Sequence, residues 1–135
     1  MGFLVCRCLR SGLLVWEVLP MSLTPQQVEK RLYDLSLEMD EAHNALVEAE
    51  TQYSTLKAVY EIAMAKSRMR NSHPDMKMTV VMRDDQALID NAEKHEAVAF
   101  AEATVKAHRG NVARIKTQVD ITRSISSSIK ATLDL

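Results

Sequence analysis

The sequence is poor in the residues that interrupt helices or fill compact mixed cores. Its 135 residues include three Gly, three Pro, one Trp, three Tyr and two Phe. No Gly or Pro occurs between Pro25 and Pro74, so nothing in that stretch would break a helix. The formal net charge of −1 provides no overall field that would attract nucleic acid or a membrane surface. These absences favour a single all-α domain.

Residues 1–20 differ in composition from the rest and contain both cysteines, Cys6 and Cys8. Their charged residues exclude a signal peptide and a membrane span. With GAG for the glutamate, the codons of Trp16-Glu17-Val18 read GGGAGGT, a strong bacterial ribosome-binding sequence a few nucleotides before the Met21 codon. We therefore expect that Met21 is the true start in a bacterium or a bacterial virus, and that residues 1–20 are a disordered, non-native extension. The alternative is a genuine N-terminal extension. A chain from Met21 has no cysteine and so no thiol chemistry.

A seam of apolar or small residues follows, in alternating steps of four and three. This is the a/d spacing of a coiled coil, sustained for about five heptads. Thr24 as N-cap, Pro25 at the first helical position and Gln27 in a capping box mark a helix start. We predict a helix over residues 25–70. Its seam consists of Val28, Leu32, Leu35, Met39, Ala42, Leu46, Ala49, Tyr53, Leu56, Tyr60 and Ala63.

A second helix is predicted over residues 80–133, after a turn at about 71–79 that contains Pro74. Thr79 would be its N-cap. Met76–Met82 could also form a short strand, but nothing else in the chain would pair with it. Gly110 belongs to a second stripe, of small residues, and would mark a close crossing or a bend. The seam of this helix is weaker and consists of Val98, Ala101, Val105, His108, Val112, Ile115, Val119, Thr122, Ser126, Ile129 and Leu133.

Charge selects the arrangement of the two helices. Residues 29–50 carry a net charge of −5 and residues 106–130 a net charge of +5, whereas residues 51–70 are +3 and residues 71–96 are −3. If the chain folds back near Pro74, stretches of opposite net charge lie side by side, whereas a parallel arrangement would place stretches of like charge side by side. We therefore predict an all-α antiparallel coiled-coil hairpin. A thin hairpin buries little surface per residue, so we also predict self-association.

Basic residues surround the predicted turn and could contact a nucleic-acid backbone. The alternative is a capped helix end beside an exposed loop, because nearby aspartates dilute the charge and no aromatic ring is available to stack a base. Nucleic acid is therefore possible but not favoured. No catalytic, cofactor or metal motif is present: His95-Glu96 begins a zinc motif, but Ala99 replaces the second histidine. The basic tip cluster consists of Lys66, Arg68, Arg70, Lys77 and Arg83.

Several short motifs after the turn carry a family resemblance: Met78-Thr79-Val80, Arg83-Asp84-Asp85, Arg114–Asp120 and Thr122-Arg123-Ser124. With the long first helix, they resemble the small all-helical hairpin proteins encoded in the early regions of tailed bacteriophages. Most of these proteins have no assigned activity, so the resemblance implies an accessory role in the cytoplasm of an infected bacterium and no site residues.

We expect a non-enzymatic protein that binds a copy of itself or a phage or host protein, without a membrane or a cofactor. One alternative is a DNA-binding accessory of phage recombination or replication that uses the basic tip cluster. A further alternative is a structural or assembly-chaperone protein of the virion.

Overall fold

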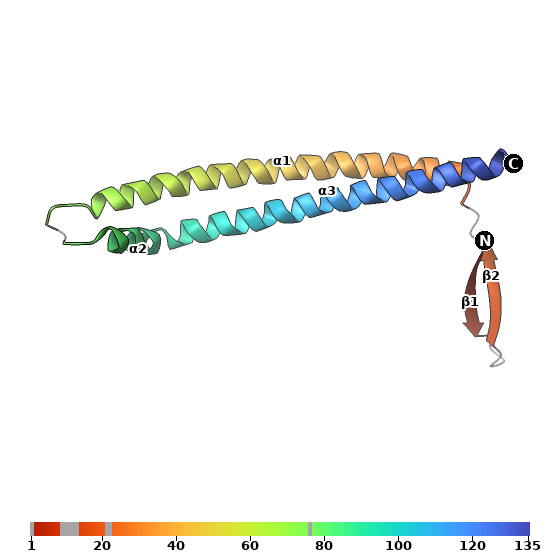
Figure 1. The fold of residues 1–135 in the computed structure, drawn as a ribbon, viewed down its shortest axis with the longest axis horizontal. Coiled ribbons are helices and arrows are strands. Elements are labelled where there is room, and N and C mark those ends of the chain that lie inside the picture. Colours follow the sequence, from red (N-terminus) through yellow and green to blue (C-terminus); the bar gives the residue numbers. More distant parts are fainter. Residues whose placement is uncertain (1, 9–13, 21–22, 76) are drawn as a thin grey trace. The chain divides into compact units, whose positions relative to one another are not determined.

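The described part of the chain is mostly helical. The computed structural model describes residues 2–8, 14–20, 23–75 and 77–135, with side chains from residue 23 onward. The chain divides into a central unit, Leu35–Val119, and a terminal unit, Met1–Asp34 with Asp120–Leu135. In chain order, the elements in Figure 1 are β1 (Gly2–Cys8), β2 (Leu14–Pro20), α1 (Pro25–Arg70), α2 (Val80–Asp90) and α3 (Ala92–Leu133).

The start of α1 is held by the capping box that the sequence predicted. The backbone N–H of Gln27 donates to Thr24 Oγ1 at 3.3 Å, and the backbone N–H of Thr24 donates to Gln27 Oε1 at 3.0 Å. These two bonds satisfy donors that the first turn of a helix otherwise leaves without partners. The helix then runs from Pro25 to Arg70, the range predicted from the sequence.

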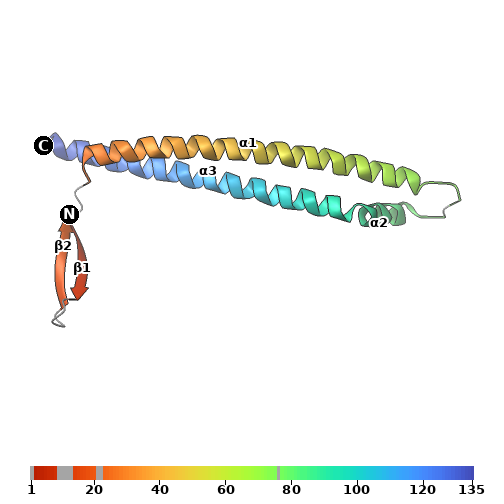
Figure 2. The same cartoon turned by 180° about the vertical axis from the view of Figure 1, so that it is seen from behind.

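Within the central unit, α1 and α3 pack side by side, as both Figure 1 and Figure 2 show. The core cluster is formed by Leu35 and Ala42 of α1 and Ile115 of α3, with exposed fractions of 5% or less. Residues near the end of α1 contact residues just after the turn, and residues nearer the start of α1 contact residues later in the chain. These contacts are Arg68–Asp84, Ser67–Asn91, Tyr60–His95 and Glu50–Arg109.

After the turn, the chain forms two helices rather than the single helix that we predicted. Thr79 is the N-cap of α2, as expected, and its Oγ1 accepts a hydrogen bond from the Met82 backbone N–H at 3.3 Å. The break occurs at Asn91, whose φ of −119° and ψ of 22° are not helical. The Asn91 side chain donates to the Ala87 carbonyl at 2.8 Å and so competes with the backbone ladder of the helix.

In the terminal unit, the backbones of β1 and β2 form a two-stranded antiparallel ladder that pairs Gly2 with Pro20 and Cys8 with Leu14. Our expectation of a disordered, non-native extension covers residues 1–20, of which residues 1 and 9–13 lie outside the described residues, as does Met21. That expectation stays a prediction.

Candidate interaction surfaces

The seam residues of both helices lie toward the contact between α1 and α3. In α1, Val28 and Leu35 are buried, whereas Leu56 is 37% exposed and lies at the edge of the seam. In α3, Val105 and Ile115 are buried. Ala42, Ala49 and Ala101 are buried as well, whereas Leu133 at the end of the predicted seam is 69% exposed. The other seam residues are half-buried, namely Leu32, Met39, Leu46, Tyr53, Tyr60, Ala63, Val98, His108, Val112, Val119, Thr122, Ser126 and Ile129.

Beyond Tyr60, the inner face of α1 follows a path that the apolar pattern did not reveal. It continues through Met64, Ser67 and Asn71, which are 8%, 1% and 7% exposed. Asn91 donates to Ser67 Oγ at 3.1 Å, and Arg70 donates to the same oxygen at 2.9 Å. The seam therefore becomes polar near the turn. A search for apolar spacing passes over serine and asparagine, although the step from Tyr60 to Met64 and Ser67 keeps the four-three rhythm.

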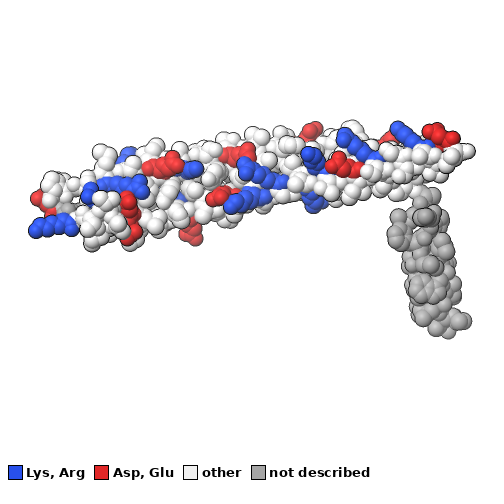
Figure 3. Space-filling view, in the orientation of Figure 1, with Lys and Arg blue, Asp and Glu red and all other residues white. Residues whose placement is uncertain are grey.

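The basic tip cluster lies where the end of α1 meets α2. Arg68 Nε donates to Asp84 Oδ1 at 2.7 Å, and Arg70 is engaged with Ser67. Lys66 and Lys77 are exposed, and Arg83 is half-buried. Figure 3 shows basic and acidic side chains next to each other at this end. The structure thus brings together the end of α1 and the start of α2, but a carboxylate offsets part of the positive charge.

Charged pairs occur where the two long helices face each other. Arg109 Nη2 and Nε donate to Glu50 Oε1 at 2.7 and 3.2 Å, which joins an acidic stretch of α1 to a basic stretch of α3. Along α3, Lys106 Nζ lies 2.9 Å from Glu102 Oε1. The hydrogen bond from Lys106, together with its charge, lowers the pKa of Glu102. Both pairs are exposed and therefore add little stability, and the Glu50–Arg109 pair, which joins the two helices, favours one alignment.

The outer side of α1 presents a stripe without charge, which we call the outer α1 stripe: Asn44, Val47, Thr51, Thr55 and Ile62. Their spacings of three, four, four and seven place them on one face of the helix. All five are exposed, with 62% exposure for Val47 and 56% for Ile62. The two threonine hydroxyls donate to carbonyls four residues earlier, so they have partners already. Such a surface can be covered without leaving a charge or a hydroxyl donor unpaired.

The small residues of α3 also lie outward rather than against α1. Ala99, Ala103, Ala107 and Gly110 are all exposed. A Cβ added at Gly110 would meet nothing within 4 Å, and Gly110 lies inside α3. In the described part of the chain Gly110 therefore marks no close crossing with α1. A bend, or a close approach by a helix of a second subunit, stays a prediction.

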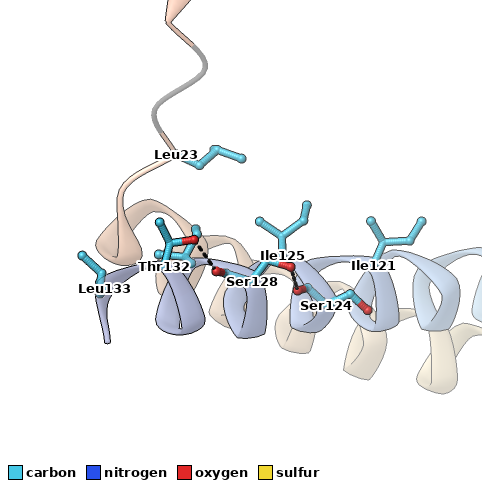
Figure 4. Close-up of a pocket in the computed structure, with 8 residues that line it drawn as sticks. Leu23, Ile121, Ser124, Ile125, Ser128, Thr132 and Leu133 are labelled. Carbon is cyan, nitrogen blue, oxygen red and sulfur yellow. Dashed lines mark hydrogen bonds between the residues drawn. The ribbon is translucent and has the colours of Figure 1, made fainter. Parts of the chain in front are cut away.

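The terminal unit contains a groove of about 600 Å³, the terminal groove, between Leu23 and the last turns of α3. Figure 4 shows Leu23 on the side toward which Ile121 and Ile125 project. Ile121 is 55% exposed and Leu23 is 45% exposed, so this apolar surface is open to water. The apolar spacing in the sequence did not identify a groove at this end of α3. The lining consists of Leu23, Ile121, Ser124, Ile125, Ser128, Ile129, Thr132 and Leu133.

Among the side chains of residues 23–75 and 77–135, no three His, Cys, Asp or Glu residues lie close enough to hold a metal ion together. No helix in this described range has the length and apolar character needed to cross a bilayer.

No protein family, curated protein or solved structure matches this sequence. The resemblance to phage hairpin proteins and the expected location in an infected cell therefore stay predictions, and the surfaces themselves must indicate what the protein does.

Proposed function

We propose that this chain is a non-enzymatic protein–protein interaction protein whose scaffold is an antiparallel coiled-coil hairpin. The reversed order of the contacts between Arg68 and Asp84, Tyr60 and His95, and Glu50 and Arg109 supports that scaffold. In this proposal the seam holds the two long helices together, and the outer faces of the helices bind the partner. An accessory role in a phage-infected bacterium is consistent with the proposal and is part of it.

The observation that carries the proposal is the outer α1 stripe. Outer faces of two-helix coiled coils are usually charged, because they contact only water. Here Val47 and Ile62 are more than half exposed, and the threonines between them have satisfied hydroxyls. A face of this composition is typical of a helix that packs against a further helix. It offers no cation to a phosphate backbone and no reactive pair to a substrate.

The test is a capture experiment with the tagged full chain in the cells that naturally produce it. We expect a partner that is retained by the wild type and lost with Val47→Glu, because the substitution places a charge in the centre of the stripe. Val81→Glu is the matched control, since Val81 of α2 is 69% exposed and lies outside the stripe. Circular dichroism checks that both variants stay helical. Equal retention by both variants, or no protein enriched over the tag alone, contradicts the proposal.

Binding of single-stranded DNA at the tip is a second candidate, supported by the exposed lysines Lys66 and Lys77 of the basic tip cluster. If the tip binds DNA, affinity falls steeply with salt, and Lys66→Ala with Lys77→Ala weakens it because each neutralised phosphate contributes to the salt dependence. Lys106→Ala is the control at an exposed lysine of α3. Binding that is absent at low salt, or equal in all variants, eliminates the tip as a nucleic-acid site.

A further inference from the structure

Two rows of side chains run along the terminal groove, and each row repeats every four residues. Ile121, Ile125, Ile129 and Leu133 form a ridge of large side chains. Ser124, Ser128 and Thr132 form a low row beside that ridge. A ridge at i±4 spacing packs into a groove of the same spacing on another helix, which is the commonest packing class of helices in globular proteins. This surface of α3 carries both the ridge and the low row that such a contact needs.

The low row can be covered at little cost, because its hydroxyl groups already donate within α3. Ser124 donates to the Asp120 carbonyl at 3.0 Å, and Ser128 donates to the Ser124 carbonyl at 3.1 Å. Thr132 donates to the Ser128 carbonyl at 2.9 Å, and Figure 4 shows the last two of these bonds. A buried hydroxyl with a bonded donor avoids most of the desolvation penalty that an unpaired one would pay.

The charges of this region favour an occupant of balanced charge. None of the residues lining the groove is charged. Around it, residues 23–34 and 120–135 carry four basic side chains and four acidic ones, so two copies do not repel each other through a common sign. An anionic membrane or a nucleic acid would require an excess of positive charge. The charged side chains are Lys30, Arg31, Arg123 and Lys130 against Glu29, Asp34, Asp120 and Asp134.

We propose that the occupant of the terminal groove is the terminal groove of a second copy of this chain. The ridge of each copy lies in the low row of the other, around a two-fold axis near Ser128, the middle residue of the low row. The contact is self-complementary, as a two-fold interface requires. This proposal rests on the proposed function, since it names the partner of one surface. The outer α1 stripe remains free for a different protein.

Sedimentation of the purified full chain at about 100 µM tests this, because a weak specific dimer is populated there. A reducing agent keeps Cys6 and Cys8 from linking copies. We expect a dimer for the wild type and a dissociation constant raised about tenfold or more by Ile121→Lys, since the ammonium group would enter an apolar contact. Ile62→Lys is the matched control, because it is the same substitution at equal exposure, 56% against 55%.

The outcomes separate this proposal from the proposed function. A wild-type chain that is monomeric, or a dimer that Ile62→Lys weakens as much as Ile121→Lys does, overturns the terminal groove as the contact. Loss of self-association does not affect the capture experiment with Val47→Glu, which reports on a different surface. Circular dichroism of the Ile121→Lys variant verifies that its helices persist.

A cross-linking experiment tests the two-fold arrangement directly. In a Cys6→Ser, Cys8→Ser background, Ser128→Cys should form a disulfide-linked dimer on oxidation, because the two-fold axis brings this position close to its own copy. Ser127→Cys is the control: Ser127 is equally an exposed serine of α3 but does not line the groove. Equal yields of linked dimer from the two variants contradict the arrangement.

Discussion

At the scale of single residues, a few side chains without exposed surface hold the helix pair together. Leu35 is 0% exposed and belongs to the same cluster as Ala42 and Ile115. A narrow seam has few such positions, so each contributes a larger share of the burial than it would in a globular core. Polar residues take over this role near the turn, where Ser67 and Asn91 are buried and bonded to each other.

Truncation of Leu35 tests the seam. We expect Leu35→Ala to lower the free energy of unfolding by about 2–5 kcal/mol, because it removes a fully buried side chain and leaves a cavity. Leu37→Ala, two residues away and 47% exposed, should have a far smaller effect. Urea denaturation followed by circular dichroism measures both. Similar losses in the two variants would mean that the buried face has been assigned wrongly.

Substitution of Gly110 should stabilise the fold, whereas truncation of Leu35 should destabilise it. Gly110 lies inside α3, and a Cβ there would meet nothing within 4 Å. Gly110→Ala should therefore raise the free energy of unfolding by about 0.5–1 kcal/mol, through the lower backbone entropy of alanine in the unfolded chain. The same denaturation experiment measures it. A loss of stability would show that a Cβ at this position meets a neighbour, for example in an assembly.

Glu102 provides a test of pH dependence. Its hydrogen bond from Lys106, and then the charge of Lys106, lower its pKa below the ordinary carboxyl value. A carboxylate with a lowered pKa in the folded state stabilises the fold at higher pH, and this contribution disappears as the pH falls through the lowered pKa. An NMR titration should give a midpoint below the ordinary value, and Lys106→Ala should return it there. An unchanged midpoint would show that the contact does not persist in solution. The pair is exposed, so added salt should weaken the effect.

At the scale of elements, the break between α2 and α3 is the main irregularity of the described chain. The α1 helix is continuous, whereas the second half of the sequence bends at Asn91. There the Asn91 side chain bonds both the Ala87 carbonyl and Ser67 Oγ. The bond to Ser67 ties the end of α2 to α1, and the bond to Ala87 competes with the backbone ladder of α2. They explain why one asparagine within a strongly helical sequence ends a helix.

Removal of the Asn91 side chain should destabilise α2 more than α1. We expect Asn91→Ala to cost about 1–3 kcal/mol, because buried partners lose their hydrogen bonds. Hydrogen exchange should become faster in Val80–Asp90, while the middle of α1 keeps its protection. Asn44→Ala, at an exposed asparagine of α1, is the control. Uniform acceleration across all three helices would show that α2 does not open separately.

At the scale of the whole molecule, the question is how many copies make the stable unit. Each long helix buries one seam and leaves apolar side chains on its other side, including Val47 of α1 and Phe100 of α3, at 62% and 75% exposure. A protein that dimerises through the terminal groove also gains stability by mass action, which a monomer does not.

The thermal midpoint should therefore rise with protein concentration. A tenfold increase raises the apparent stability of a coupled dimer by about 1.4 kcal/mol, which corresponds to a rise of several degrees. Scanning calorimetry over a series of concentrations measures this. The concentration dependence should disappear in Ile121→Lys and persist in Ile62→Lys. A thermal midpoint of the wild type that does not change with concentration would contradict dimerisation through the terminal groove.

The sequence alone determined that the chain from Pro25 is mostly helical, where α1 begins and ends, where α2 begins, and most of the apolar positions that are buried in α1 and α3. These properties follow from local capping and from spacing along one helix, as at Thr24, Thr79 and the seam from Val28 onward. The tertiary structure decided the break at Asn91, the polar continuation of the seam through Ser67, and the terminal groove. Each of these depends on neighbours distant in sequence or on the outward direction of side chains, because a hydrogen bond to another helix leaves no periodic trace in the chain.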